Sequence, residues 1–205
     1  MYEVLPSFVL GFHGCDRQVA EKVITGNEKL KKSSNNYDWL GNGIYFWENN
    51  PERALDYANL LKDNPRGKSA KIKQPYVIGA VIDPGYCLNL LDSSGLREVK
   101  EAYNMLEKAT KKAGNQLPEN RPIEKEGDLL LRNLDCAVIE LLHTYNRENN
   151  KREYDTVRGV FFEGKELYPN AGFREKNHIQ LCVRNPNCIK GYFHVREYDT
   201  NFPIP

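Results

Sequence analysis

Two short segments combine the residue types that can hold a flat polar ring. The pair His13-Gly14 stands near the N-terminus, and Gly41-Asn42-Gly43 precedes an Ile-Tyr-Phe-Trp run at 44–47. Glycine lets the backbone adopt positive φ or approach a ligand closely, and the run that follows favours a strand. An aromatic face beside accessible backbone N–H and C=O groups suits a planar ligand with hydrogen-bonding substituents. The alternative interpretation is a glycine bulge that leads into a core strand.

The elements that must position these segments follow from hydrophobic periodicity. Asp16 is expected to cap a short helix that stops at Gly26, and Asn50-Pro51 is a helix start. The run at 76–82 shows no alternation, which indicates a strand buried on both faces. Further strands are expected at 8–12, 157–163, 179–183 and 188–195, and further helices at 94–113 and 128–145. Strands and helices in this order indicate an α+β fold with a helical insertion at about 93–146.

The composition places limits on the kind of partner. A chain of 205 residues with a net charge of +1 suits one domain, 1–205, without a global field for nucleic acid or membrane. The one local basic cluster lies at 62–73 and is usually a solvated loop. Five cysteines in a chain of this size are typical of reduced thiols. Cys182 and Cys188 with His178 match no structural zinc spacing, so no metal site is expected.

The N-terminal segment and the hydropathy favour a soluble protein. The first residues carry no basic region followed by an apolar core of signal-peptide length. No apolar run approaches the roughly 20 residues that a membrane helix needs. The sequence therefore predicts a cytoplasmic location and no membrane partner.

The two opening segments carry a family resemblance. Phe12-His13-Gly14, a short helix, and then Gly41-Asn42-Gly43-Ile44-Tyr45-Phe46 before a helix resemble the diphtheria-toxin-like and poly(ADP-ribose)-polymerase-like ADP-ribosyltransferases. That family carries a His-Tyr-Glu signature. His13 and Tyr45 match its first two positions, and the third falls best on Gln180. Glu163 and Glu175 are rival candidates for the third position.

The resemblance implies a fold, a co-substrate and a reaction. The fold would be two packed mixed or antiparallel sheets around an NAD cleft. The reaction would cleave the bond between nicotinamide and ribose in NAD and transfer ADP-ribose to an acceptor. Such chemistry requires a fixed carboxamide, a sandwiched ring, fixed ribose hydroxyls and exclusion of water. NAD would be a co-substrate.

Each matched residue is expected to meet one of these needs. The backbone of Gly14 would bind the carboxamide, with Gly43 allowing close approach. His13 would donate a hydrogen bond to a ribose hydroxyl. Tyr45 would stack on the nicotinamide, with Tyr57 as the candidate for the opposite face. Gln180 would bind the nicotinamide-ribose hydroxyls through its amide.

Glutamine in the third position narrows the expected activity. A neutral amide stabilises an oxocarbenium less than a carboxylate does and cannot act as a general base. The sequence therefore predicts transfer of a single ADP-ribose, to a protein or a nucleic acid. Small stand-alone domains of this type are similar to bacterial toxins and defence effectors, which implies an antitoxin or regulatory partner. The alternatives are a non-catalytic module that binds NAD or ADP-ribose, and an NAD glycohydrolase.

Overall fold

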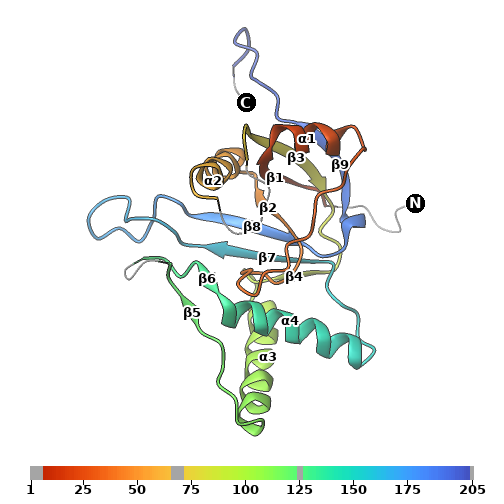
Figure 1. Cartoon of the computed structure of the whole chain (residues 1–205), viewed down its shortest axis with the longest axis vertical. Coiled ribbons are helices and arrows are strands. Elements are labelled where there is room, and N and C mark those ends of the chain that lie inside the picture. The colour runs from red at the N-terminus through yellow and green to blue at the C-terminus, as the bar shows by residue number, and fades with distance from the viewer. Residues whose placement is uncertain (1–6, 66–71, 124–126, 204–205) are drawn as a thin grey trace.

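A seven-stranded sheet forms the centre of the computed structural model, which describes residues 7–65, 72–123 and 127–203 (Figure 1). Its strand order is β4-β7-β8-β2-β1-β3-β9. The pair β4–β7 is parallel and the other neighbouring pairs are antiparallel. The strands of this sheet are β1 (Val9–Asp16), β2 (Ile44–Glu48), β3 (Pro75–Ile82), β4 (Cys87–Asn89), β7 (Thr156–Phe161), β8 (His178–Val183) and β9 (Ile189–His194). A separate two-stranded ribbon consists of β5 (Asn120–Arg121) and β6 (Leu131–Arg132).

The first two helices begin at the caps that the sequence predicts. In α1 (Arg17–Ile24), the Asp16 carboxylate accepts a hydrogen bond from Gln18 N at 3.0 Å. The chain leaves this helix through Gly26, whose φ is +76°. In α2 (Pro51–Asp63), the Asn50 side chain accepts from Arg53 N at 3.0 Å, with Pro51 in the first turn. These caps set where each helix leaves the sheet.

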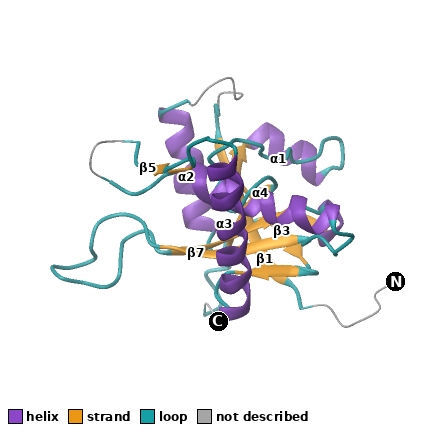
Figure 2. Cartoon of the chain, turned by 90° about the horizontal axis from the view of Figure 1, so that it is seen from below, coloured by secondary structure: helices purple, strands orange, loops and turns teal. Residues whose placement is uncertain are grey.

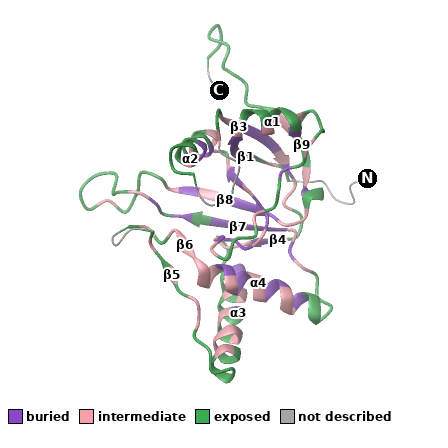
Figure 3. Cartoon of the chain, viewed as in Figure 1, coloured by how far each residue is buried: buried purple, intermediate pink, exposed green. Residues whose placement is uncertain are grey.

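Alternation along the strands divides the core between the two faces of the sheet. Helix α1 covers one face, where Phe46, Ile78 and Leu181 are fully buried (Figure 3). The other face carries Phe12, Trp47 and Val77 under α2. The same face continues over β7 and β8, where α4 (Asn133–Glu148) packs with Val138, Ile139 and Leu142. Two helical units, α2 and α4, therefore flank the middle of this second face.

The inserted segment forms the lower part of the molecule in Figure 1. Helix α3 (Ser93–Lys112) packs against α4, with Ala102 fully buried in the same core cluster as Val138 (Figures 1 and 2). Both helices that the sequence predicts in this segment are present, and α4 packs on the sheet. A 3₁₀ turn (Pro186–Cys188) connects β8 to β9 at the position where the sequence predicts a turn.

Several expectations about the fold are wrong. The two packed sheets are instead a single seven-stranded sheet, because the pairing of β2 with β1 and with β8 joins the two halves. The helix expected at 128–145 begins at Asn133, because Asn120 Oδ1 accepts from Leu134 N and Asp135 N and fixes the first turn there. Leu131 lies in β6 instead.

Other differences concern the ends of strands. The strand expected at 8–12 continues through His13 and Gly14 to Asp16, because all eight residues of β1 pair with β3. The strand expected at 157–163 ends at Phe161. The short parallel strand β4 was not predicted. Of the basic cluster at 62–73, residues 66–71 lie outside the described residues. None of the described helices is long and apolar enough to cross a membrane.

His143 makes the stability of the fold depend on pH. It is 1% exposed in α4, and its ring contacts Tyr154. Burial lowers its pKa to about 4, an effect that the nearby Arg184 guanidinium reinforces. An unfolded histidine titrates near 6.5, so the unfolded chain binds this proton more readily between the two values. The stability that the neutral ring contributes is complete above about pH 6.5 and is lost as the pH falls toward 4.

We therefore predict that lowering the pH from 7 to 5 destabilises the wild type by about 2 kcal/mol more than a His143→Leu variant, from the two pKa values. Urea unfolding at both pH values measures the difference, and subtraction removes the contribution of every other titrating group. Parallel pH profiles for the two proteins would contradict the assignment.

Candidate functional site

The three strands that carry the signature residues are neighbours in the sheet. His13 lies on β1, Tyr45 on β2 and Gln180 on β8, in the order β8-β2-β1. Cross-strand pairing places Trp47 opposite both Phe12 and Gln180. Residues that are directly opposite, or two apart on one strand, share a face. Tyr45 and Gln180 therefore share the face that α2 and α4 flank, whereas His13 belongs to the opposite face.

The pairing of β1 with β2 ends next to His13. The register between them contains Gly11 opposite Glu48 and Phe12 opposite Trp47. Continued by two residues, it would place Gly14 opposite Tyr45. Instead, His13 Nδ1 lies 2.8 Å from the Tyr45 carbonyl oxygen. The imidazole thus bonds the Tyr45 carbonyl, which in a regular ladder would accept from the N–H of Gly14.

Gly14 lies where the two strands separate. It pairs with Val77 of β3, but with no residue of β2 in the described strands. The Leu10 carbonyl accepts from Asn49 N, which continues β2, and alternate residues of a strand direct their backbone groups to the same side. The N–H and C=O of Gly14 therefore point toward β2. An added Cβ would lie 2.1 Å from the Ala54 carbonyl of α2, so only glycine fits beneath this helix.

The hydrogen bond of His13 fixes which of its ring nitrogens can serve a ligand. Burial lowers the pKa of His13, so the ring is neutral at pH 7. Because a carbonyl only accepts, Nδ1 carries the proton and Nε2 keeps its lone pair. The expectation that His13 donates to a ribose hydroxyl is corrected by this geometry. In the neutral ring, Nε2 can accept from a hydroxyl.

Tyr45 is held by the segment 40–43, named the glycine loop below. Its hydroxyl accepts from Leu40 N at 2.9 Å and donates to the Gly41 carbonyl at 2.7 Å. Burial raises the pKa of Tyr45 well above its usual value, so the phenol is not a proton donor or base near neutral pH. Its ring packs beside the core cluster under α4. Any stacking on a ligand would use the rest of the ring.

The two glycines of the loop are required by close packing. Gly41 has a φ of +77°, and an added Cβ would lie 2.5 Å from a carboxylate oxygen of Glu140. Gly43 exchanges both of its backbone hydrogen bonds with Ser33, at 2.8 and 3.1 Å. A ligand that used the backbone of Gly43, as the sequence suggested, would have to replace Ser33.

An ion pair from the insertion fixes the glycine loop. Glu140 of α4 accepts from Asn42 N at 2.7 Å and from the guanidinium of Arg184. Arg184 in turn donates to the Asn42 carbonyl at 3.0 Å. The side chains of Glu140 and Arg184 are 29% and 16% exposed, so the pair is largely shielded from water. Burial opposes ionisation of Glu140, but its hydrogen bonds from Arg184 and Asn42 hold its pKa below the usual value.

Gln180 presents an uncharged amide beside Tyr45. It lies opposite Gly159 of β7 as well as Trp47 of β2, and it is half-buried. Its side-chain amide has no hydrogen-bond partner among the described residues. The rival Glu175 is exposed, in the loop that precedes β8. Gln180 is thus placed to hydrogen-bond a ligand over this face.

Aromatic side chains cover the region between Gln180 and α2. Tyr57 of α2 contacts Trp47, with ring centroids 5.0 Å apart and an interplanar angle of 46°. Trp47 is 4% exposed and also contacts the ring of His178, at 6.3 Å. Tyr57 therefore lies on the same face as Tyr45 and Gln180, next to Trp47.

A buried polar cluster, which the sequence did not predict, lies beside Gln180. Arg53 of α2 pairs with Glu163 at 3.0 Å, and their side chains are 15% and 11% exposed. His178 Nδ1 lies 2.7 Å from the Lys176 carbonyl. Burial lowers the pKa of His178 to about 4 and raises that of Glu163, although Arg53 acts in the opposite sense on the carboxyl.

The cluster has unused hydrogen-bonding capacity. Trp47 Nε1, Arg53 Nε and His178 Nε2 are buried without a partner among the described residues. Each such atom is costly unless water or a ligand satisfies it. The cluster joins β2, α2 and β8, which are distant in sequence, so no local motif could have predicted it. Glu163 is the other candidate for the third position, and its carboxylate forms an ion pair with Arg53.

In the part of the chain that the structure describes, the cysteines and acidic residues form no metal centre. All five cysteines are free, and Cys182 Sγ contacts the Gly41 carbonyl at 3.6 Å. Burial raises the pKa of Cys182, so this thiol is protonated. Among the described residues, no group of three or more His, Cys, Asp or Glu side chains could hold a metal ion.

The chain is similar to a protein from an archaeon. The chain is 26% identical over 195 residues to an uncharacterized protein of Methanocaldococcus jannaschii, covering 87% of this chain and 83% of the archaeal protein. No protein-family model matches the chain. No solved structure matches it either. The similarity shows that a related chain of comparable length occurs in an archaeon, and it assigns no activity.

We predict that Glu140→Ala loosens the glycine loop and lowers the free energy of unfolding by about 2 kcal/mol, because it leaves Arg184 without its carboxylate in a shielded position. Urea unfolding measures the loss, and hydrogen exchange at the Asn42 amide measures the loosening. Glu148→Ala, at an exposed position of the same helix, is the matched control. Unchanged exchange at Asn42 in the Glu140 variant would show that the loop does not depend on this ion pair.

Proposed function

We propose that the protein is an NAD-dependent mono-ADP-ribosyltransferase that acts on a macromolecular acceptor. The observation that carries the proposal is the adjacency of β1, β2 and β8. His13 and Gln180 are 167 positions apart in the chain, and they lie on strands that both neighbour the strand of Tyr45. A chance match of His-Gly and Gly-x-Gly-Ile-Tyr-Phe motifs would not require this arrangement.

The separation of β1 from β2 supports binding of the nicotinamide carboxamide. A carboxamide presents one carbonyl and one NH₂ group, which complement a backbone N–H and C=O. Gly14 directs both groups toward β2 at a point where β2 does not pair with it. In the proposal, the carboxamide continues the ladder there. His13, whose ring lies on the other face of the sheet from Gln180, keeps this gap open by bonding the Tyr45 carbonyl.

Gln180 explains why a single transfer is proposed. Its amide can hold the hydroxyls of the nicotinamide ribose and so orient the bond that breaks. As the nicotinamide leaves as a neutral ring, positive charge develops on the ribose, and a neutral amide stabilises it through its carbonyl dipole alone. A growing polymer would need a base to activate a ribose hydroxyl, and Gln180 cannot supply one. The acceptor would therefore bring its own nucleophile, either protein or nucleic acid.

The neutral residue at position 180 also favours a second candidate. A fold of this kind with a glutamine in place of glutamate could bind NAD or ADP-ribose without turnover. The hydroxyl of Tyr45 is hydrogen-bonded to the backbone of the glycine loop, so it is not available to a substrate. The same assay separates the two candidates.

The test is incubation of the protein with NAD labelled in its adenylate phosphate, together with a lysate as the source of acceptor. We predict that label enters macromolecules. Gln180→Ala should lower NAD consumption about 100-fold, as for loss of a hydrogen bond made in the transition state. Gln180→Glu, which restores a carboxylate, should retain it.

The controls address folding and the rival residue. Tyr198→Ala changes an exposed side chain and should leave NAD consumption unchanged. Glu163→Gln keeps a hydrogen-bond partner for Arg53, and a loss confined to this variant would move the third position from Gln180 to Glu163. Free ADP-ribose as the sole product would indicate a glycohydrolase. Binding of NAD without turnover would indicate a binding module.

A further inference from the structure

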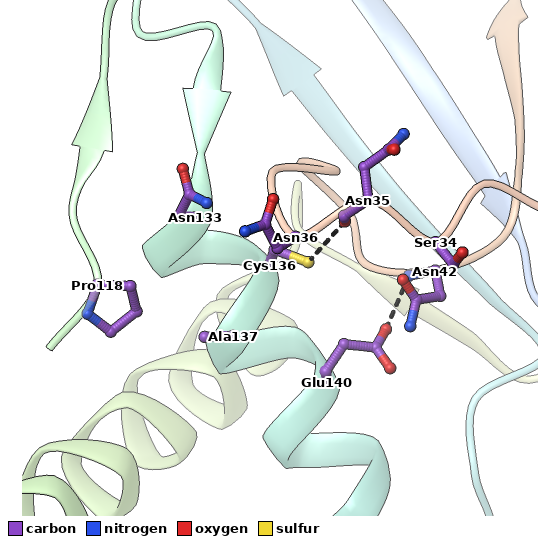
Figure 4. A pocket seen from close by; sticks show the side chains of 9 residues that line it. All are labelled: Ser34, Asn35, Asn36, Asn42, Pro118, Asn133, Cys136, Ala137 and Glu140. Atoms are coloured by element: carbon purple, nitrogen blue, oxygen red, sulfur yellow. Dashed lines mark hydrogen bonds between the residues drawn. The ribbon is translucent and has the colours of Figure 1, made fainter. Parts of the chain in front are cut away.

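A cavity of about 380 Å³ lies beside the glycine loop, on the side of the insertion (Figure 4). Its walls come from the segment that precedes the loop, from the loop itself, from the start of α4 and from the chain before β5. The residues that line it are Ser34, Asn35, Asn36, Asn42, Pro118, Asn133, Cys136, Ala137 and Glu140. Its volume falls in the range of small-molecule sites.

The cavity is rich in primary amides from separate parts of the chain. Asn36, Asn42 and Asn133 each contribute a side chain, and none of these three amides has a hydrogen-bond partner among the described residues. Asn35 differs, because its amide donates to Ser33 and Asp38 within its own turn. Three amides therefore offer both donors and acceptors to a ligand.

The rest of the lining is apolar or electrically neutralised. Pro118, Ala137 and the buried Cys136 supply apolar surface between the amides (Figure 4). The carboxylate of Glu140 is engaged by Arg184 and by the backbone of Asn42. Neither a lysine nor an arginine is among the described residues that line the cavity. Such a lining disfavours a phosphate or a carboxylate and suits an uncharged ring with polar edges.

We infer that this cavity binds a nucleobase, with adenine the best match. An asparagine amide donates and accepts in one plane, and it pairs with the N6 and N7 edge of adenine through two hydrogen bonds. The apolar surface of Pro118 and Ala137 then contacts the face of the ring. The inference is independent of the proposed transfer reaction, since it rests on these side chains alone.

A ligand in the cavity would affect the position of Tyr45 through the glycine loop. Asn42 belongs to the glycine loop, and Tyr45 is bonded to the neighbouring Gly41 and Leu40. A base that binds the Asn42 side chain therefore restricts the loop that holds Tyr45. This gives the cavity a route to the proposed reaction, without making it part of the reacting centre.

The test is a titration of the ¹⁵N-labelled full chain with adenosine, observed at the side-chain amide resonances of asparagine. We expect saturable shifts at Asn36, Asn42 and Asn133. The double variant Asn36→Ala/Asn133→Ala should raise the Kd for adenosine about tenfold or more, as for the loss of a two-bond contact. Asn115→Ala, exposed beyond the end of α3, should leave it unchanged.

Two further ligands identify the group that is recognised. NAD, which contains adenine, should shift the same three resonances, whereas nicotinamide mononucleotide, which lacks it, should not. Competition between NAD and adenosine for these resonances would assign the cavity to the dinucleotide. Shifts caused by adenosine that NAD neither produces nor displaces would assign it to a free nucleoside or nucleotide. The inference is overturned if about 10 mM adenosine, enough for millimolar affinity, gives no saturable shift, if the double variant binds unchanged, or if the mononucleotide gives the same shifts. NAD consumption, measured separately, decides the proposed function.

Discussion

The hydrogen bond from the His13 imidazole to the Tyr45 carbonyl is the interaction on which the rest of the candidate site depends. The imidazole bonds the carbonyl that the next pair of a regular antiparallel ladder would use. The pairing of β1 with β2 therefore ends after two positions. The consequence is local and specific. The backbone of Gly14 faces a strand that does not pair with it, and the neutral ring of His13 is left with one free acceptor.

The surrounding elements keep this separation in place from both sides. Over Gly14, α2 packs so closely that the Ala54 carbonyl leaves no room for a side chain. On the other side, α4 holds the glycine loop through Glu140 and Arg184, and the loop holds the hydroxyl of Tyr45. Helix α4 thus positions the central strand of the site. It also forms one wall of the amide-lined cavity.

The features of the fold that depend on neighbouring residues in the sequence were predicted correctly. The caps at Asp16 and Asn50, the strand containing Gln180 and the helices α3 and α4 all follow from short stretches of residues, and all are found in the structure. The single sheet could not be predicted, because two rungs between β1 and β2 decide whether its halves join. The same holds for the Arg53–Glu163 pair, whose members are 110 residues apart. The role of Gly43 was inferred from its freedom to approach a ligand, whereas its backbone is already bonded to Ser33.

We propose that the gap beside Gly14 receives the nicotinamide carboxamide. The most direct measurement is a titration of the ¹⁵N-labelled protein with nicotinamide, observed at backbone amide resonances. We predict a saturable shift that is largest at Gly14, with little change at Gly11, whose backbone pairs with β3. Binding of nicotinamide that leaves Gly14 unmoved, or no saturable shift at Gly14 at any concentration, would contradict it.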